Sequence, residues 1–157
     1  RENMFGIEDV LLGRRAIEGR EVAVIGGGHV GLEVAHSLCA NNKVTIVEMA
    51  DEIGASVYYI TKFKLLPMLR EAGVTFRTGQ AIAAVDDGSI RLRDTHTGQC
   101  TELKAEAVVL AMGIRPDLAA RAAFDRNFDH VVYAGDAVRG GTMLEANRDA
   151  FALAWEF

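Results

Sequence analysis

Three consecutive glycines separate two segments of different periodicity, and this arrangement limits the folds open to the chain. Residues 21–26 (EVAVIG) are rich in β-branched residues, as is typical of a buried strand. Val30, Val34 and Leu38 then recur at four-residue spacing and predict a helix that begins at the glycines. Residues 43–48 (KVTIVE) predict a second strand. A strand, a helix and a strand within about 30 residues require a parallel strand pair with a right-handed crossover.

The following part of the chain continues this pattern with one interruption. A helix around residues 60–73 and strands at 74–77 and 107–113 extend the predicted parallel sheet. Between these two strands lie three short alternating segments, separated by Asp and Gly turn residues: 81–85, 89–93 and 100–104. Such segments predict a small antiparallel meander inserted in the parallel fold.

The last part of the chain predicts one more strand and one more helix. An alanine-rich passage after Pro116 leads to a strand at residues 131–136 (VVYAGD) and a helix at 143–155. The predicted fold class is therefore α/β. It consists of a Rossmann-like parallel sheet with a small antiparallel β-meander insertion, of the three-layer ββα type, plus a C-terminal strand-helix segment.

Composition excludes several classes of function. The formal net charge is −5, so the chain lacks the positive field on which nonspecific nucleic-acid binding depends. No apolar stretch approaches the roughly 18 residues that span a bilayer. Cys39 and Cys100 form neither a CxxC motif nor a metal-ligand cluster, which favours a reducing cytoplasm. We therefore expect no nucleic-acid or membrane partner, no metal site and a cytoplasmic location.

The glycine segment also fits a phosphate-binding motif. Its six residues match GxGxxG: Gly26, Gly27, Gly28, His29, Val30 and Gly31. In such a loop the first glycine permits a tight turn, the second lets a pyrophosphate approach the backbone, and the third lets the helix pack on the strand. The helix N-terminus adds free N–H groups and a partial positive charge. A flexible glycine loop is the alternative, but the flanking strand and helix favour dinucleotide binding.

Glu48 supports the same interpretation. It ends the second predicted strand about 20 positions after Gly26, where a carboxylate is expected to bind the adenosine ribose. A 2′-phosphate at this place would face a like charge, and residues 49–52 offer no arginine to offset it. We therefore expect NAD(H) to be preferred over NADP(H). The alternative is that Glu48 is only a solvated strand end.

Four stretches carry a likeness to a known family. They are VIGGGHVGLEVA (residues 24–35), Glu48, AMGIRPD (residues 111–117) and VYAGDAV (residues 132–138). Together they resemble the FAD-dependent pyridine nucleotide-disulphide oxidoreductase family. EDVLLG, VEMADEIG and GDAVRGGTMLEANRDAFALAWE are most similar to the C-terminal NAD(P)/FAD half of old-yellow-enzyme-related NADH:flavin oxidoreductases. These are of the 2,4-dienoyl-CoA reductase, enoate reductase and trimethylamine dehydrogenase type.

The resemblance implies that NADH binds to this chain and passes hydride to an FAD in a neighbouring domain. It places Ala111, Met112 and Gly113 beside the dinucleotide, and Glu33 near the nicotinamide and the flavin. Glu33 is thus the one candidate for a role close to the chemistry. The alternative for Glu33 is a carboxylate in the first turns of a helix, where the helix dipole favours negative charge.

The resemblance also implies a second FAD-binding motif near the end of the chain. Gly135 and Asp136 match it, and the aspartate of this motif binds the ribityl chain of the flavin. An ordinary turn at these two residues is the alternative.

The chain also departs from the family pattern. No glycine-rich strand-to-helix turn precedes Gly26, and there is no CxxxxC redox pair, FMN barrel or iron–sulphur cysteine cluster. We therefore expect part of a longer reductase, with negligible activity in isolation. Its predicted parts are a connector (residues 1–19), an NAD(H)-binding domain (20–118) and a returning segment of an FAD-binding domain (119–157). The alternative function is a non-catalytic module that binds ADP or NAD in a structural role.

The missing FAD and FMN domains would be the natural partners of such a chain. The last predicted helix is expected to cover the FAD domain in the complete protein. Without that domain, Phe151, Trp155 and Phe157 are expected to be exposed and to favour a homodimer through this helix.

Overall fold

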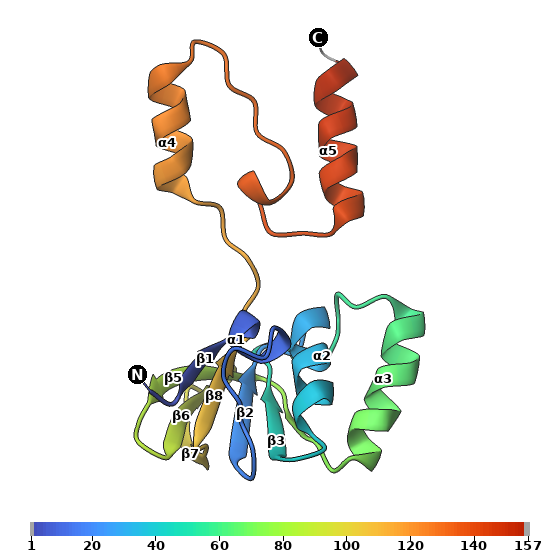
Figure 1. The fold of residues 1–157 in the computed structure, drawn as a ribbon, viewed down its shortest axis with the longest axis vertical. Helices are drawn as coiled ribbons and strands as arrows, with labels where there is room; N and C mark the ends of the chain where they lie inside the picture. The colour runs from blue at the N-terminus through green and yellow to red at the C-terminus, as the bar shows by residue number, and fades with distance from the viewer. Residues whose placement is uncertain (1, 156–157) are drawn as a thin grey trace. The chain divides into compact units, whose positions relative to one another are not determined.

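The computed structural model describes residues 2–155, which divide into two compact units (Figure 1). Unit 1 ends at Met112 and unit 2 begins at Gly113. Among the described elements, unit 1 contains both sheets and the first three helices, and unit 2 contains the last two helices. The boundary lies ahead of the predicted one at residue 118, because the last strand of unit 1 stops at Leu110.

The centre of unit 1 is a parallel sheet. Its strands are β1 (Met4–Gly6), β2 (Glu21–Ile25), β3 (Lys43–Val47), β4 (Thr75–Arg77) and β8 (Ala107–Leu110). Their order across the sheet is β1-β8-β2-β3-β4, so β2 lies in the middle. Ile25 pairs with Val47 on one side and with Leu110 on the other. Since all pairings are parallel, the carboxyl ends of the strands share one edge of the sheet.

Helices cover one face of this sheet. They are α1 (Ile7–Leu11), α2 (His29–Leu38) and α3 (Tyr59–Glu71). Val22 and Val24 of β2 face the helices and pack in one core with Leu32 of α2 and Leu69 of α3. Successive side chains of a strand point to opposite faces, so Ala23 belongs to a different core. The parallel sheet of unit 1 is thus buried on both of its faces, as is usual for parallel sheets.

The antiparallel meander covers the opposite face. It consists of β5 (Gln80–Val85), β6 (Ser89–Asp94) and β7 (Cys100–Lys104), paired in that order. Ile90 and Leu92 of β6 pack against Ala23 and Ile25 of β2 and Val108 of β8. The predicted three-layer arrangement of meander, parallel sheet and helices is therefore confirmed (Figure 1).

Part of the predicted connector is instead built into unit 1. β1 pairs in parallel with β8, and the Phe5 side chain is only 4% exposed. Arg15 lies over the Phe5 ring at 3.8 Å and donates to the Met4 carbonyl at 2.8 Å. A three-residue strand is too short to show the periodicity of a strand, and its partner lies about a hundred residues away in sequence. Residues 4–11, which lie within the predicted connector, thus form a strand and a helix of unit 1.

Unit 2 contains α4 (Leu118–Asn127), a 3-10 turn at Gly135–Ala137 and α5 (Met143–Trp155). The strand predicted at residues 131–136 does not form: residues 131–134 have no regular structure and the 3-10 turn follows. A strand needs a neighbouring strand for its backbone hydrogen bonds, and the described residues of unit 2 include none. The C-terminal strand-helix prediction is thus corrected to a loop and a helix.

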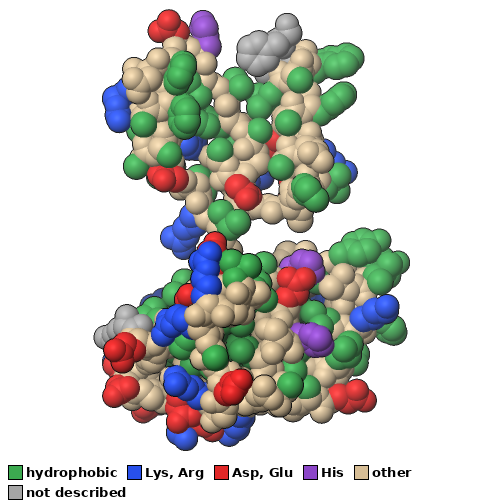
Figure 2. Space-filling model, in the orientation of Figure 1, with side chains coloured by type: hydrophobic (Ala, Val, Ile, Leu, Met, Phe, Trp, Pro, Cys, Tyr) green, Lys and Arg blue, Asp and Glu red, His purple; other side chains and the backbone are tan. Residues whose placement is uncertain are grey.

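No side chain of unit 2 is buried, as far as residues 113–155 show. Large apolar side chains lie on its surface, with Phe151 70% and Trp155 82% exposed, and Figure 2 shows such side chains along this unit. Phe157, which was expected in the same patch, lies outside the described residues. None of the helices within residues 2–155 is long and apolar enough to cross a membrane.

Candidate functional site

The candidate site lies at the carboxyl edge of the parallel sheet, where the chain changes direction across it. After β2 the chain passes through α2 to β3 on one side, whereas β8 returns on the other side of β2. Ligands of open α/β sheets bind in the crevice at such a switch point. Gly26 follows β2 and donates to the Val47 carbonyl at 2.8 Å, and Ala111 follows β8 and donates to the Ile25 carbonyl at 2.8 Å.

Two glycines of the loop are required by the fold itself. Gly26 has φ +110°, and a Cβ atom on it would lie 2.3 Å from the carbonyl oxygen of Ala111. A Cβ atom on Gly31 would lie 1.9 Å from the carbonyl oxygen of Gly26. The turn after β2, the end of β8 and the first turn of α2 therefore touch backbone to backbone. The predicted roles of a tight turn and close helix packing are both visible here.

Gly28 is different, because nothing in unit 1 requires a glycine there. It is the N-cap of α2 with an ordinary φ of −75°, and a Cβ atom on it would meet no atom within 4 Å. No side chain caps the helix at this position. The backbone N–H groups of the first turn therefore face an open space and are free to bind an anion.

Glu48 is fixed against the same loop. Its Oε2 atom accepts a hydrogen bond from Gly27 N–H at 2.7 Å, and its Oε1 atom accepts from Ala50 N–H at 2.9 Å. The Gly27 carbonyl in turn accepts from Gly54 N–H at 2.9 Å. A carboxylate oxygen has two lone pairs, so each oxygen of Glu48 retains one for a hydroxyl donor. The predicted ribose-binding carboxylate therefore lies beside the predicted phosphate loop.

The N-terminal turns of α2 present two further predicted residues to solvent. His29 and Glu33 are exposed, and the His29 Nε2 atom lies 3.6 Å from Glu33 Oε1. This distance allows an ion pair when the imidazole is protonated. Val30 is also partly exposed, at 36%. Loop and helix thus offer a mixed polar and apolar rim next to the open space at Gly28.

The remaining predicted residues divide between the two units. Ala111 lies in the switch-point crevice, and the Met112 side chain is 61% exposed. Gly113 has φ +81° and begins unit 2. In unit 2, Asp136 Oδ1 accepts from Gly141 N–H at 3.2 Å, beside a hollow of 360 Å³. The lining residues of this hollow are Ala134, Gly135, Asp136, Gly141, Thr142, Met143 and Ala146.

Sequence reasoning missed several neighbours of Glu48. The Arg77 carbonyl accepts from Glu48 N–H at 2.8 Å, so Arg77 ends the next strand at the same edge of the sheet. Asp51 Oδ1 lies 2.6 Å from His96 Nε2, which comes from the turn between β6 and β7. The strand order would have pointed to Arg77, since carboxyl ends of parallel strands meet at one edge. No local sequence signal indicates the contact between Asp51 and His96.

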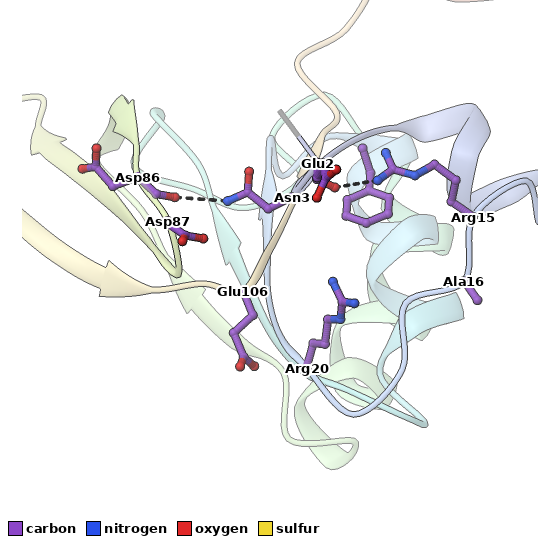
Figure 3. Close-up of a pocket in the computed structure, with 9 residues that line it drawn as sticks. Glu2, Asn3, Arg15, Ala16, Arg20, Asp86, Asp87 and Glu106 are labelled. Atoms are coloured by element: carbon purple, nitrogen blue, oxygen red, sulfur yellow. Dashed lines mark hydrogen bonds between the residues drawn. The ribbon is translucent and has the colours of Figure 1, made fainter.

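A cavity larger than the hollow beside Asp136 lies elsewhere, at the amino ends of β1, β2 and β8 (Figure 3). Its volume is 860 Å³ and it is lined by Glu2, Asn3, Phe5, Arg15, Ala16, Arg20, Asp86, Asp87 and Glu106. Arg15 and Asn3 are both tied to backbone carbonyls there. None of the predicted site residues lines it. Size alone therefore does not mark the candidate site, which we assign from the backbone geometry at Gly26 to Gly31.

Comparison with known proteins gives both a family and relatives. The family model described as pyridine nucleotide-disulphide oxidoreductase matches residues 2–132. The NADH oxidase of Thermoanaerobacter brockii is 33% identical over 162 residues, which cover 99% of this chain and 25% of that protein. The chain thus spans about a quarter of the length of this relative.

Solved structures show the same fold. Histamine dehydrogenase from Rhizobium sp. 4-9 matches with a TM-score of 0.78 at 18% identity, over 99% of this chain and 26% of the other. The 6-hydroxypseudooxynicotine amine oxidase from Pseudomonas geniculata N1 matches with a TM-score of 0.74 at 27% identity, over 94% and 23%. The predicted family resemblance is confirmed, and because the family model spans most of its length, this chain belongs to the pyridine nucleotide-disulphide oxidoreductases.

Proposed function

We propose that this chain is the NADH-binding domain of a longer flavin-dependent oxidoreductase, in which it delivers hydride from NADH to FAD. The observation that carries the proposal is the contrast within the glycine loop. At Gly26 and Gly31 the position that a Cβ atom would take is blocked by backbone atoms of the protein. At Gly28 the same position is open, at the start of α2. The free N–H groups at the start of a helix favour a negatively charged group such as a pyrophosphate in this space.

Glu48 supports NADH over NADPH. Its carboxylate is fixed beside the loop, where the adenosine ribose of a dinucleotide with its pyrophosphate at Gly28 would lie. A 2′-phosphate there would meet a like charge, at about 4 kcal/mol for two unit charges 4 Å apart at an effective dielectric of 20. A relative that is named an NADH oxidase agrees with this preference.

The protein's own part in the reaction is to position the reactants. NADH supplies the hydride and FAD accepts it when both are bound, so no side chain has to act as an acid or base. We assign the backbone of Ala111, Met112 and Gly113 to the nicotinamide side of the site, since Ala111 lies in the crevice next to Gly26. Glu33, on the exposed face of α2, is assigned to the rim near the nicotinamide and the flavin.

Unit 2 is assigned to the FAD-binding part of the longer protein. Asp136 lies beside a hollow of 360 Å³, in keeping with a residue that binds the flavin ribityl chain. The absence of buried side chains in residues 113–155 supports a cover supplied by the missing FAD domain. In the isolated chain, the same apolar surface with Phe151 and Trp155 would favour a homodimer.

A second candidate is a module that binds ADP or NAD without turnover. It is favoured by one observation: the phosphate loop and Glu48 lie together in unit 1, so the adenosine half of the site needs nothing from unit 2. Both candidates predict the same adenosine contacts. They differ in whether the nicotinamide contributes to affinity.

Calorimetric titration of the chain with NADH, NADPH and ADP tests these assignments. The NADH domain is supported if NADH binds tightly and NADPH and ADP each bind at least about tenfold more weakly. A tenfold difference in dissociation constant corresponds to a binding free-energy difference of about 1.4 kcal/mol. Equal affinity for NADH and ADP would show that the nicotinamide has no pocket and would favour the second candidate. Binding of none of the three would contradict both.

A further inference from the structure

The turn between β6 and β7 contacts the chain segment that follows β3. His96 Nε2 lies 2.6 Å from Asp51 Oδ1, across 45 positions of sequence. The turn itself is rigid, because Asp94 Oδ1 accepts from the N–H groups of His96 at 3.0 Å and of Thr97 at 2.7 Å. Two well-defined segments therefore meet in one ion pair.

Backbone hydrogen bonds join the same two segments. Thr95 N–H donates to the Gly79 carbonyl at 2.8 Å, and Gly79 N–H donates to the Ala50 carbonyl at 2.9 Å. Ala50 N–H then donates to Glu48 Oε1 at 2.9 Å. A short chain of contacts thus leads from the turn with His96 to the carboxylate that faces the glycine loop.

We propose that His96 is a positioning residue for nucleotide binding: paired with Asp51, it holds residues 48–51 in the conformation in which Glu48 meets the adenosine ribose. This inference rests on the proposed function. A ligand that selects the held conformation must also favour the protonated imidazole, because coupling between two equilibria is reciprocal. His96 itself touches no part of the ligand in this proposal.

The charges around His96 set the direction of the pH effect. Asp51, by its hydrogen bond and then by its charge, raises the pKa of His96, and Asp94 in its own turn acts in the same direction. The ion pair is therefore present at low pH and is lost as the pH rises through the pKa of the folded state. Nucleotide affinity is expected to fall over the same range.

ADP-ribose is the appropriate probe, because it carries the adenosine, ribose and pyrophosphate but no nicotinamide. Calorimetry at about pH 6 and about pH 8.5 brackets the titration of a histidine. Exposed ion pairs are weak, so the dissociation constant should rise by about two- to fivefold across this range through His96. The measured quantity is the difference between the wild-type chain and each variant, so that contributions from other groups cancel.

His96→Gln and Asp51→Asn should both lose this part of the pH dependence and bind as weakly at low pH as the wild-type chain does at high pH. His36→Gln, an exposed histidine on α2, is the matched control and should keep the wild-type profile. By NMR, the midpoint of the His96 ring titration should move to higher pH when ADP-ribose is added.

Three outcomes would overturn the proposal. The first is an unchanged pH profile of ADP-ribose binding in His96→Gln, and the second is the same His96 titration midpoint with and without ADP-ribose. Either result would refute the positioning role alone and would not contradict the proposed NADH binding. Failure of the wild-type chain to bind ADP-ribose at any pH would refute the proposed function, and this inference with it.

Discussion

The backbone N–H of Gly27 donates a 2.7 Å hydrogen bond to Oε2 of Glu48, which ties the glycine loop after β2 to the end of β3. The carboxylate is thus placed before any ligand arrives. Its remaining lone pairs can accept from hydroxyl groups but can only repel a phosphate. The preference between the two nicotinamide dinucleotides is therefore expected to reside in the charge of this one side chain.

Glu48→Gln tests that expectation, because it removes the charge and keeps the length of the side chain. NADH should bind more weakly, because the amide NH2 of Gln cannot accept a hydrogen bond, so the N–H of either Gly27 or Ala50 loses its acceptor. NADPH should no longer be repelled by a negative charge at this position. The dissociation constant of NADPH divided by that of NADH should therefore fall by about tenfold, or 1.4 kcal/mol. Glu102→Gln, on the exposed strand β7, is the control. An unchanged ratio in the Glu48 variant would contradict a preference based on charge.

Gly28→Ala tests the open space at the start of α2. We expect the methyl group to leave the fold intact and to weaken NADH binding by at least about tenfold, because it occupies the position of the pyrophosphate. Gly6→Ala is a matched control, since Gly6 is the N-cap of α1 with a similar φ of −80°. Calorimetry gives the affinities and thermal unfolding gives the stabilities. Equal binding by the two variants would contradict a phosphate site at Gly28.

Gly26→Ala should instead destabilise the protein. The substitution combines an unfavourable φ with a contact to the Ala111 carbonyl, and overpacking of this kind costs about 1–3 kcal/mol. Gly98→Ala isolates the backbone term, because Gly98 has φ +73° and open space around its Cβ position. Urea unfolding should show the larger loss of free energy for Gly26→Ala. Equal losses would mean that the loop relaxes away from Ala111.

Light scattering tests the apolar surface of α5. The chain has a mass of 17.0 kDa, and we expect a larger, concentration-dependent mass because Phe151 and Trp155 are exposed. Trp155→Glu should lower the mass toward that of a monomer. Phe63→Glu, at an equally exposed phenylalanine on α3, should leave it unchanged. A wild-type monomer at all concentrations would contradict self-association.

Local patterns were enough to predict the centre of the fold. The strand, the glycine loop and the helix from Glu21 to Leu38 follow from periodicity, and the meander follows from its turn residues. In the same way, Gly26 and Gly31 behave as a GxGxxG motif requires. These features depend on residues close together in sequence.

Features that depend on distant contacts could not be predicted. β1 exists because β8 offers it a partner, and residues 131–136 fail to form a strand because unit 2 offers none among its described residues. The contact between Asp51 and His96 joins a loop and a turn that carry no shared pattern.

The uneven distribution of buried side chains has a practical consequence for protein engineering. Residues 2–112 contain every buried side chain that the structure describes, together with the glycine loop and Glu48. We therefore expect a chain truncated after Met112 to fold by itself and to retain the proposed nucleotide-binding residues. This shorter chain would lack the exposed apolar surface of α5. Titration of this shorter chain with NADH and NADPH would show whether the proposed cofactor preference resides in unit 1 alone.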